Sequence, residues 1–480
     1  MNEHLDVLIV GAGLSGIGAA YRIGHDRPDR RWAIFEARDA IGGTWDLFRY
    51  PGIRSDSDMT TLGFPFYPYR GEKAIADGAD ILAYLRDTAR TFGIDRHIRY
   101  GHRVVAADWS SADARWTITY EVDGQRARMT CRLVFFCSGY YDYTRGHAPE
   151  WPGMADFGGT IAHPQAWPVD FPITGKRVVV IGSGATAVTL VPALVAQGAA
   201  HVTMLQRSPS YIVAMPAQDR LGAALSRLLP TRIADTLTRW KSIAYSVGSY
   251  TLARRRPDLV KRQIAKQQRA ALGDSYDVAK HLTPRYNPWD QRLCLVPDGD
   301  LFAVLRDGRA TIVTDTIDRF IPAGIALTSG DILPADLIVT ATGLRLKLLG
   351  GATLSLDGRT IEPHRHLVYK GAMFSDVPNM AFSTGYTNAS WTLRSDLSAR
   401  FVARLLAHMD ATGATVATPV PQAVEEATTP LLDLNSGYIQ RVAQWLPRQG
   451  RRVPWLVQQN YVRDTLTMRG RVDDGVLRFR

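Results

Sequence analysis

Two stretches of the chain repeat one pattern, in which a short apolar run, a glycine-rich turn and a longer mixed stretch lead to a second apolar run. The first pattern spans residues 5–35 and the second spans residues 177–206. Short apolar runs bounded by glycine predict buried strands, and the mixed stretches predict helices, the first reaching about Arg22. Each pattern is therefore a β–α–β unit, and its repetition predicts two Rossmann-like domains.

Closely spaced small residues mark the turn of each unit. They are Gly11, Gly13 and Gly16 in the first unit, and Gly182, Gly184 and Ala187 in the second. Such residues let the backbone at a helix N-terminus approach a pyrophosphate closely. A tight turn without a ligand is the alternative, but the strand before each turn and the helix after it favour dinucleotide binding.

The end of the second strand distinguishes the two units. In the first unit Glu36 stands there, and its carboxylate accepts hydrogen bonds from ribose hydroxyls and repels a 2′-phosphate. In the second unit Arg207 and Ser208 stand there, and a guanidinium beside a hydroxyl suits a 2′-phosphate, although Arg207 could also be a solvated surface residue. These differences indicate FAD in the first unit and NADPH in the second. An enzyme that holds both moves a hydride from nicotinamide to flavin.

Two further strand-like runs, residues 133–136 and residues 336–339, each lead into a glycine turn, and we expect the chain to pass between domains near them. The predicted fold class is α/β, with two Rossmann-like dinucleotide-binding domains. The FAD-binding domain is expected to be discontinuous and to comprise residues 1–145 and 340–480. The NADP-binding domain is expected to comprise residues 146–339.

Positive charge is concentrated in one segment. The 480-residue chain has 57 Lys and Arg against 46 Asp and Glu, a net charge of +11, and residues 219–269 hold twelve of these cations against three acids. Helix formers dominate there, so residues 216–290 are predicted to form a basic helical insertion in the second domain. Such a face is most often simply solvated, but it could also touch an anionic membrane peripherally or help a lipophilic substrate reach the site.

The cysteine content narrows the class of protein. Three cysteines, Cys131, Cys137 and Cys294, exclude a disulfide scaffold and a four-cysteine zinc site, and no metal site is expected. They fit a reducing compartment, so the protein is expected in the cytoplasm. Cys131 and Cys137 do not form a C-x-x-C pair, which argues against a thiol–disulfide reductase with the same two nucleotide sites.

A segment between the two units carries a family resemblance. It matches the F-x-G-x-x-x-H-x-x-x-W-P fingerprint of type I Baeyer–Villiger monooxygenases at every fixed position, namely Phe157, Gly159, His163, Trp167 and Pro168. A second pattern of the same family is matched by Gly43, Trp45, Tyr50, Pro51, Gly52 and Asp56. Within the family the chain most resembles the branch of ethionamide-activating monooxygenases, as seen in residues 42–58, 286–297 and 385–393.

The resemblance implies a reaction as well as a fold. Members of the family use NADPH and O₂, and their reduced flavin forms a C4a-peroxide. As the anion, this peroxide inserts an oxygen atom next to a ketone carbonyl and gives an ester or lactone; as the hydroperoxide, it oxidises a sulfide to a sulfoxide. The expected partners are therefore O₂ and a small lipophilic ketone or sulfide, with no nucleic acid, and the oligomeric state is left open.

Such a reaction needs a fixed cation near the flavin. The resemblance implies that Arg292 is this cation and that Asp56 is its ion-pair partner, and both are expected to be catalytic. An arginine stays charged in any protein site, so it stabilises an oxyanion without titrating. A structural ion pair between domains is the alternative. Many family members have a lysine just before this arginine to help bind the 2′-phosphate, but Gln291 stands here, so the preference for NADPH is expected to be moderate.

Further residues are expected around the flavin. Gly43, Trp45, Asp56 and Asn388 are expected to contact FAD, although core packing is an equal alternative for Trp45. Asn388 precedes a helix predicted from Trp391 to about Leu406, whose first amides could face the flavin pyrimidine or simply need an N-cap. Trp391 is a candidate for the substrate pocket. His163 is expected to couple the domains and not to transfer protons.

Two other functions are kept open. The first is a flavin-containing monooxygenase that acts mainly on sulfur or nitrogen; Trp167 and Pro168 argue against a relative that oxidises only nitrogen. The second is a basic nucleotide-binding or membrane-binding protein without catalysis. Consumption of NADPH would separate the second from the enzymes.

Overall fold

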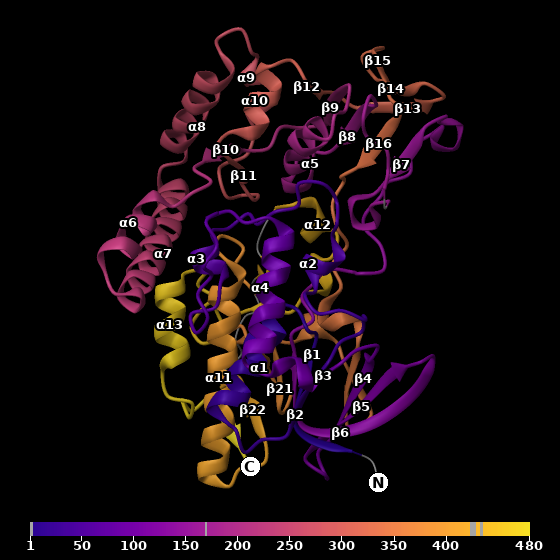
Figure 1. Ribbon diagram of the computed structural model, residues 1–480. Coiled ribbons are helices and arrows are strands. Elements are labelled where there is room, and N and C mark those ends of the chain that lie inside the picture. The colour runs from indigo at the N-terminus through magenta and orange to yellow at the C-terminus, as the bar shows by residue number, and fades with distance from the viewer. Residues whose placement is uncertain (1–2, 169, 423–428, 433–434) are drawn as a thin grey trace.

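The computed structural model describes residues 3–168, 170–422, 429–432 and 435–480, and most of their strands belong to two sheets (Figure 1). The first sheet has nine strands in the order β18-β17-β4-β5-β6-β1-β2-β3, with β21 paired to β6. Its parallel part comprises β1 (His4–Val10), β2 (Trp32–Phe35), β3 (Ile98–Arg99), β21 (Met380–Phe382) and the end of β6 (Gln125–Phe136). Its antiparallel part comprises β4 (Arg103–Ser110), β5 (Arg115–Val122) and β6. At the edge β17 (Thr353–Leu356) pairs in parallel with β4 and antiparallel with β18 (Arg359–Ile361).

The first sheet is covered on both faces, which explains why residues 7–10 of β1 are all apolar and buried. Val7 and Ile9 face one core, and Leu8 and Val10 face another. The first core is covered by α1 (Leu14–Asp26), α4 (Gly78–Thr91) and α11 (Trp391–Thr412), and α1 packs directly against α11. Helix α11 extends beyond the predicted end near Leu406 and stops at Gly413, whose φ of 71° ends the helix in the left-handed region.

The second sheet is wholly parallel, with the order β12-β9-β8-β16-β7. Its strands are β7 (Thr160–Ala162), β8 (Arg177–Ile181), β9 (His201–Gln206), β12 (Ala310–Thr314) and β16 (Leu337–Thr340). Helices α5 (Ala185–Ala196) and α10 (Asp300–Arg306) pack on one face. A small antiparallel sheet covers the other face and comprises β13 (Ile317–Ile321), β14 (Gly324–Leu327) and β15 (Ile332–Pro334).

A helical segment interrupts the second domain between β10 (Ile212–Met215) and β11 (Cys294–Pro297), which pair in parallel. Its helices are α6 (Arg220–Leu228), α7 (Thr231–Arg255), α8 (Pro257–Leu272) and α9 (Val278–Leu282). Figure 1 shows α6 and α7 reaching down beside the first domain, close to α13 (Tyr461–Arg469). The Arg239 guanidinium donates hydrogen bonds to the carbonyl oxygens of Thr60 (2.6 Å) and Gly63 (2.9 Å), which fixes α7 to the first domain.

Shorter elements complete the described chain. The helices are α2 (Thr44–Leu47), α3 (Met59–Leu62) and α12 (Gly437–Gln440), with short 3₁₀ turns at Ile94–His97, Met154–Asp156, Pro164–Ala166, Leu348–Gly351, Pro363–Arg365 and Ala443–Trp445. The remaining strands are β19 (Val368–Tyr369), β20 (Met373–Phe374), β22 (Ala417–Pro419), β23 (Thr429–Pro430), β24 (Arg448–Gln449) and β25 (Leu477–Phe479).

The chain passes between the two sheets twice. It leaves the first sheet after β6 and enters the second at β7, and it returns from β16 to β17. The second sheet is therefore inserted in sequence between strands of the first. The predicted α/β class, with two Rossmann-like units and a helical insertion in the second, is confirmed.

Candidate functional site

The first glycine turn lies at the end of β1, between β6 and the N-terminus of α1. Gly11 has a φ of +105°, and a Cβ on it would lie 2.8 Å from the carbonyl oxygen of Cys137. Gly16 is still more confined, because its Cβ would lie 1.8 Å from the carbonyl oxygen of Gly11. Among the described residues no side chain caps α1, whose N-cap position is Gly13. The amides of the first helical turn are thus left to a ligand.

Glu36 lies beside this turn, at the end of β2. Its carboxylate accepts hydrogen bonds from the backbone N–H groups of Ala12 (2.7 Å) and Arg38 (2.9 Å). Burial raises the pKa of Glu36, and the two backbone donors and Arg38 offset part of that rise. The acid that the sequence places after the second strand is therefore held against the glycine turn.

The second glycine turn has the same place in the second sheet. Gly182 has a φ of +139°, and its Cβ would lie 2.4 Å from the carbonyl oxygen of Ala341. No heavy atom of the described chain lies within 4 Å of a Cβ built on Gly184, so the backbone there is open. Helix α5 begins directly after Gly184 without a side-chain cap and without an acid in its first turn. Ala187 is fully buried.

Arg207 and Ser208 follow β9 beside this open turn. The Ser183 hydroxyl donates to the carbonyl oxygen of Ser208 (3.0 Å), which ties the glycine turn to the end of β9. Both Arg207 and Ser208 are exposed. Within the described chain no hydrogen bond or ion pair is formed by the Arg207 side chain, so its guanidinium is available to an anion.

A loop of the first domain, residues 43–58, extends from the first glycine turn to α5. At one end Gly43 lies against Gly13, at 3.1 Å from the Gly43 Cβ position to the Gly13 Cα. At the other end Tyr50 is buried in the core of the second domain, and burial raises its pKa. Trp45, between them, is partly buried against the first core. This loop carries Asp56 into the space between the two domains.

Arg292 meets Asp56 there. Its Nη1 donates to Asp56 Oδ2 at 2.8 Å, and the side chains remain 31% and 41% exposed. Two residues later the Cys294 thiol donates to the carbonyl oxygen of Ser183 (3.9 Å), so Arg292 lies two positions from a contact with the second glycine turn. Removal from water opposes the charge on Arg292, but the attraction of Asp56 and nearby tyrosines outweighs it and raises the pKa of the guanidinium. The group is a permanent cation between the two turns.

Three tyrosines that the sequence did not single out surround this cation. Tyr140 and Tyr141 follow the end of β6, and Tyr438 comes from α12. Burial raises the pKa of each, so all three hydroxyls stay protonated at neutral pH. The hydroxyl oxygens of Tyr140 and Tyr141 lie 3.3 Å apart. The Gly-Tyr-Tyr sequence after a buried strand is a signal for the first two, whereas only tertiary structure brings in Tyr438.

Trp391 connects this group with the first glycine turn. Its indole N–H donates to the hydroxyl of Ser15 (2.8 Å), and its ring lies 5.1 Å from that of Tyr140. Contacts thus lead from the N-terminus of α1 through Trp391 to Tyr140, which interacts electrostatically with Arg292. The structure therefore brings together the first glycine turn, Trp391, Arg292 and Asp56.

Asn388 lies just before α11. Its amide donates to the carbonyl oxygen of Gln459 (2.9 Å), while its Oδ1 is buried without a partner in the described chain. The hydroxyls of Ser383 and Ser390 nearby in sequence are likewise buried and unpaired among the described residues. Buried polar atoms without partners are uncommon, and this group indicates a polar ligand at the start of α11.

The segment from residue 157 to residue 168 lies where the chain passes between the sheets. Phe157 is buried beside Phe320, and a Cβ on Gly159 would lie 2.4 Å from the carbonyl oxygen of Asp336. The His163 ring fits against Gly146, its Nδ1 accepts from the Gln165 N–H (3.1 Å), and burial lowers its pKa. Trp167 packs on the core of the second domain, and Pro168 is half-buried beside it.

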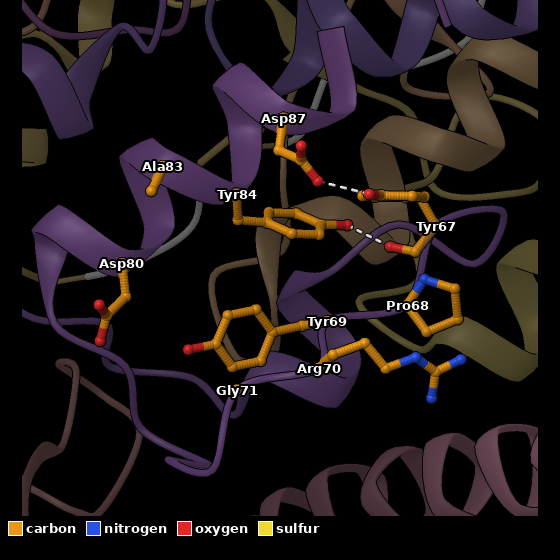
Figure 2. A pocket seen from close by; sticks show the side chains of 9 residues that line it. All are labelled: Tyr67, Pro68, Tyr69, Arg70, Gly71, Asp80, Ala83, Tyr84 and Asp87. Carbon is orange, nitrogen blue, oxygen red and sulfur yellow. Dashed lines mark hydrogen bonds between the residues drawn. The ribbon is translucent and has the colours of Figure 1, made fainter. Parts of the chain in front are cut away.

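A hollow of about 450 Å³ lies elsewhere, on the outer side of α4. Figure 2 shows it between the helix and residues 67–71, with Tyr84 hydrogen-bonded to the Tyr67 carbonyl oxygen (2.5 Å) and Asp87 to the Tyr67 hydroxyl. None of its lining residues belongs to the two glycine turns or to the surroundings of Arg292. Within the described ranges no group of three His, Cys, Asp or Glu side chains is arranged to hold a metal ion.

Comparison with known proteins identifies the family. A model described as flavin-binding monooxygenase-like matches residues 5–255. FAD-containing monooxygenase EthA of Mycobacterium tuberculosis is 52% identical over 482 residues, which cover 100% of this chain and 98% of that protein. The chain belongs to the flavin-binding monooxygenase-like family. The resemblance found in the sequence is thereby confirmed.

Other proteins are similar to this flavin-binding monooxygenase-like protein over most of its length. The probable FAD-binding monooxygenase AlmA of Acinetobacter baylyi is 46% identical and covers 100% of the chain and 97% of its own length. A steroid monooxygenase bound to NADP has a TM-score of 0.73 at 25% identity, with 88% of each chain covered. An open structure of cyclohexanone monooxygenase also gives 0.73, at 21% identity, covering 88% of this chain and 90% of that one, which shows a common fold.

Proposed function

We propose that this protein is an NADPH- and O₂-dependent flavoprotein monooxygenase. It inserts one oxygen atom next to a ketone carbonyl, giving esters or lactones, and it oxidises sulfides to sulfoxides. The observation that carries the proposal is the Arg292–Asp56 pair of 2.8 Å, placed between two glycine turns of different specificity. A fixed cation at that point is what a reaction with a developing oxyanion requires.

FAD fits the first glycine turn. The uncapped amides of α1 suit its pyrophosphate, and the Glu36 carboxylate suits its ribose hydroxyls. Gly43 lies against Gly13 and leaves no side chain at the turn. The unpaired Asn388 Oδ1 and the start of α11 suit the polar edge of the flavin ring, and Trp391 and Trp45 would lie beside it. When bound, FAD accepts a hydride from NADPH and activates O₂ for transfer of one oxygen atom.

NADPH fits the second turn. Gly184 offers an open backbone and α5 an uncapped N-terminus, to which a pyrophosphate can approach. Gly182 and the buried Ala187 keep the turn close to the sheet. Arg207 and Ser208 are exposed at the end of β9, where the 2′-phosphate would lie.

The residues of the chain between the turns supply electrostatic stabilisation. Arg292 is charged at any working pH, so it stabilises negative charge on oxygen without exchanging a proton. Asp56 accepts a hydrogen bond from it and orients its fork. Tyr140, Tyr141 and Tyr438 keep neutral hydroxyls around the same cation, so these groups are available there as hydrogen-bond donors.

The domain organisation is also a proposal. Residues 1–145 and 340–480 are assigned to the FAD-binding domain and residues 146–339 to the NADP-binding domain. The fingerprint from Phe157 to Pro168 then lies at the junction, where His163 touches Gly146 and couples the two domains. Cys131, Cys137 and Cys294 are buried free thiols, which supports a reducing compartment such as the cytoplasm.

A product assay under air tests the proposed reaction. The purified protein with its bound flavin is mixed with NADPH, a linear ketone, phenylacetone and methyl phenyl sulfide, and products are measured by mass. We expect esters and a sulfoxide, each heavier than its substrate by one oxygen atom. Sulfoxide alone would replace the proposal with a sulfur-oxidising monooxygenase, and failure to consume NADPH would refute the enzyme.

Arg207 provides a test of coenzyme choice. Replacing Arg207 by alanine removes a charge-assisted contact to the 2′-phosphate, and such contacts contribute about 1.5–3 kcal/mol, so the KM for NADPH should rise roughly tenfold to a hundredfold. The KM for NADH should change by less than about twofold, because NADH lacks that phosphate. Steady-state kinetics with both coenzymes measure this, and Arg207→Lys should recover part of the loss. Equal effects on the KM for the two coenzymes would refute the role of Arg207 in binding the 2′-phosphate.

A further inference from the structure

Exposed apolar side chains are concentrated on one edge of the molecule. Fifteen large hydrophobic side chains are exposed in the described part of the chain, and ten of them lie on α6, α7, α8 and α13. Leu228 is 80% exposed, Leu466 72% and Leu221 57%. Single exposed leucines are ordinary, but a concentration of them on neighbouring helices marks an interaction site.

Helical spacing places these residues on common faces. On α6 the apolar residues Leu221, Leu225 and Leu228 follow one another at intervals of four and three, so they share a face. On α7 the same holds for Ile233, Leu237 and Trp240, and on α13 for Val462 and Leu466. We call this surface the α6–α7–α13 patch; its exposed apolar members are Leu221, Leu228, Ile233, Leu237, Trp240, Val462 and Leu466.

The three helices form one continuous surface. Helix α6 packs on α7, where Lys241 is paired with Asp219 at the start of α6. The Trp240 ring lies 6.1 Å from that of Tyr461 at the start of α13. Figure 1 shows α6, α7 and α13 together at the left edge. Because Arg239 ties α7 to α3, the patch is fixed relative to the first domain.

Cations surround the patch, and its acids are neutralised. Arg220, Arg227, Arg232, Arg463 and Arg469 are exposed, and within the described ranges their side chains form no hydrogen bond or ion pair. By contrast, every acid on these helices has a partner: Asp219 pairs with Lys241, Asp235 with Arg70 and the buried Asp464 with Arg394. The patch therefore has an apolar centre within an uncompensated positive border.

We propose that the α6–α7–α13 patch binds the surface of an anionic lipid bilayer. Leucine and tryptophan flanked by arginine are the composition of helices that lie in a membrane interface, where apolar side chains enter the acyl boundary and cations meet the headgroups. A second copy of the chain is disfavoured, because a symmetric contact would bring the same five arginines together. The binding is interfacial, since among the described helices none is long and apolar enough to cross a bilayer.

The position of the patch explains how membrane binding would serve the proposed reaction. The patch includes α13 and α7, which contact α11 and α3 next to the first glycine turn. A lipophilic ketone or sulfide partitions into the bilayer, so a protein docked there meets its substrate at high local concentration. The surface itself does not depend on the proposed reaction, and its test measures binding alone.

Vesicle flotation tests the proposal with the intact flavin-containing protein. Vesicles of phosphatidylcholine alone are compared with vesicles of equal parts phosphatidylcholine and phosphatidylglycerol. We expect the protein to float with the anionic vesicles at low salt. Salt at about 0.5 M should release it, because surface charges are then screened within a few ångströms. If the protein stays in the soluble fraction when it is mixed with anionic vesicles at low salt, the proposal is wrong.

Two triple variants separate the contributions. Arg220→Gln with Arg227→Gln and Arg463→Gln should lower partitioning to anionic vesicles about a hundredfold. Leu221→Gln with Leu228→Gln and Leu466→Gln should lower it by at least about tenfold. All six side chains are exposed, so flavin content and Tm should match the parent protein.

A matched control uses exposed residues on other surfaces. Arg128→Gln with Arg359→Gln and Ile332→Gln changes two exposed cations and one exposed apolar residue outside the patch, and should leave partitioning within about twofold. A loss in the control as large as that in the arginine variant would show that net charge alone acts, and would refute the patch. Light scattering that finds a dimer of the parent, split by the leucine variant, would assign the patch to a second copy instead.

Discussion

Replacing Arg292 by alanine should nearly eliminate ester formation while NADPH still reduces the bound flavin. The guanidinium is the permanent cation between the two glycine turns, and Asp56 orients it at 2.8 Å. Removing one donor to a developing oxyanion costs about 2.7–4 kcal/mol, so product formation should fall by a factor of roughly a hundred to a thousand. Flavin reduction is followed by absorbance without oxygen, and ester and sulfoxide by product mass under air.

An equally long ion pair elsewhere serves as the control. Arg177 and Asp336 are joined at 2.8 Å at the outer end of the second sheet, away from both glycine turns. Arg177→Ala should leave product formation within about twofold, since exposed pairs contribute only about 0–1 kcal/mol to stability. Normal ester formation by Arg292→Ala would refute the role of Arg292 as the cation that stabilises the oxyanion. A loss of flavin reduction to the same extent would show that Arg292 acts on coenzyme binding instead.

Replacing Gly16 by alanine should deprive the protein of its flavin and destabilise the first domain. The added Cβ would lie 1.8 Å from the Gly11 carbonyl oxygen, so the start of α1 must retreat from the end of β1. Forcing a side chain into a packed site costs about 1–3 kcal/mol or more. The retreat also moves the amides that suit the pyrophosphate. Visible flavin absorbance per protein should fall by at least about tenfold, and Tm should drop.

The second turn supplies a natural comparison. Ala187 occupies the position that Gly16 has in the first turn, and it is fully buried. Ala187→Gly should keep both flavin and NADPH binding and cost only about 1 kcal/mol of stability, the helix propensity difference. Full flavin content and unchanged Tm in Gly16→Ala would show that the crowding at Gly16 is relieved at no cost.

The sequence predicts the parts of the site that depend on local geometry. Glycine is required at Gly11 and Gly182 because the backbone there has positive φ angles that other residues rarely adopt. The strand–turn–helix order in the sequence predicts where such glycines lie. Glu36 can be placed because a strand of four residues fixes its distance from the turn. The ion pair of Arg292 with Asp56 can be predicted from the sequence only through the family resemblance, because 236 positions separate the two residues.

The remainder depends on contacts between distant segments. Tyr438 lies beside Arg292 because α12 folds back across the site, and a tyrosine in a short helix has no pattern that announces this. Residues 103–132 alternate buried and half-exposed positions in β4, β5 and β6, yet only pairing reveals that they extend the first sheet. The end of α11 was available from sequence, because Gly413 is the residue type that stops a helix.

The two passages of the chain between the sheets also order events during translation. All strands of the second sheet lie between Thr160 and Thr340, so that sheet is complete before β17 has been synthesised. Strand β4 ends at Ser110, and its partner β17 begins only at Thr353. Synthesis of the chain between them takes on the order of tens of seconds at ribosomal speed. During this interval β4 presents an open edge to other nascent chains. The first sheet is therefore started first and finished last, and under the proposed assignment FAD meets a complete site only near the end of synthesis.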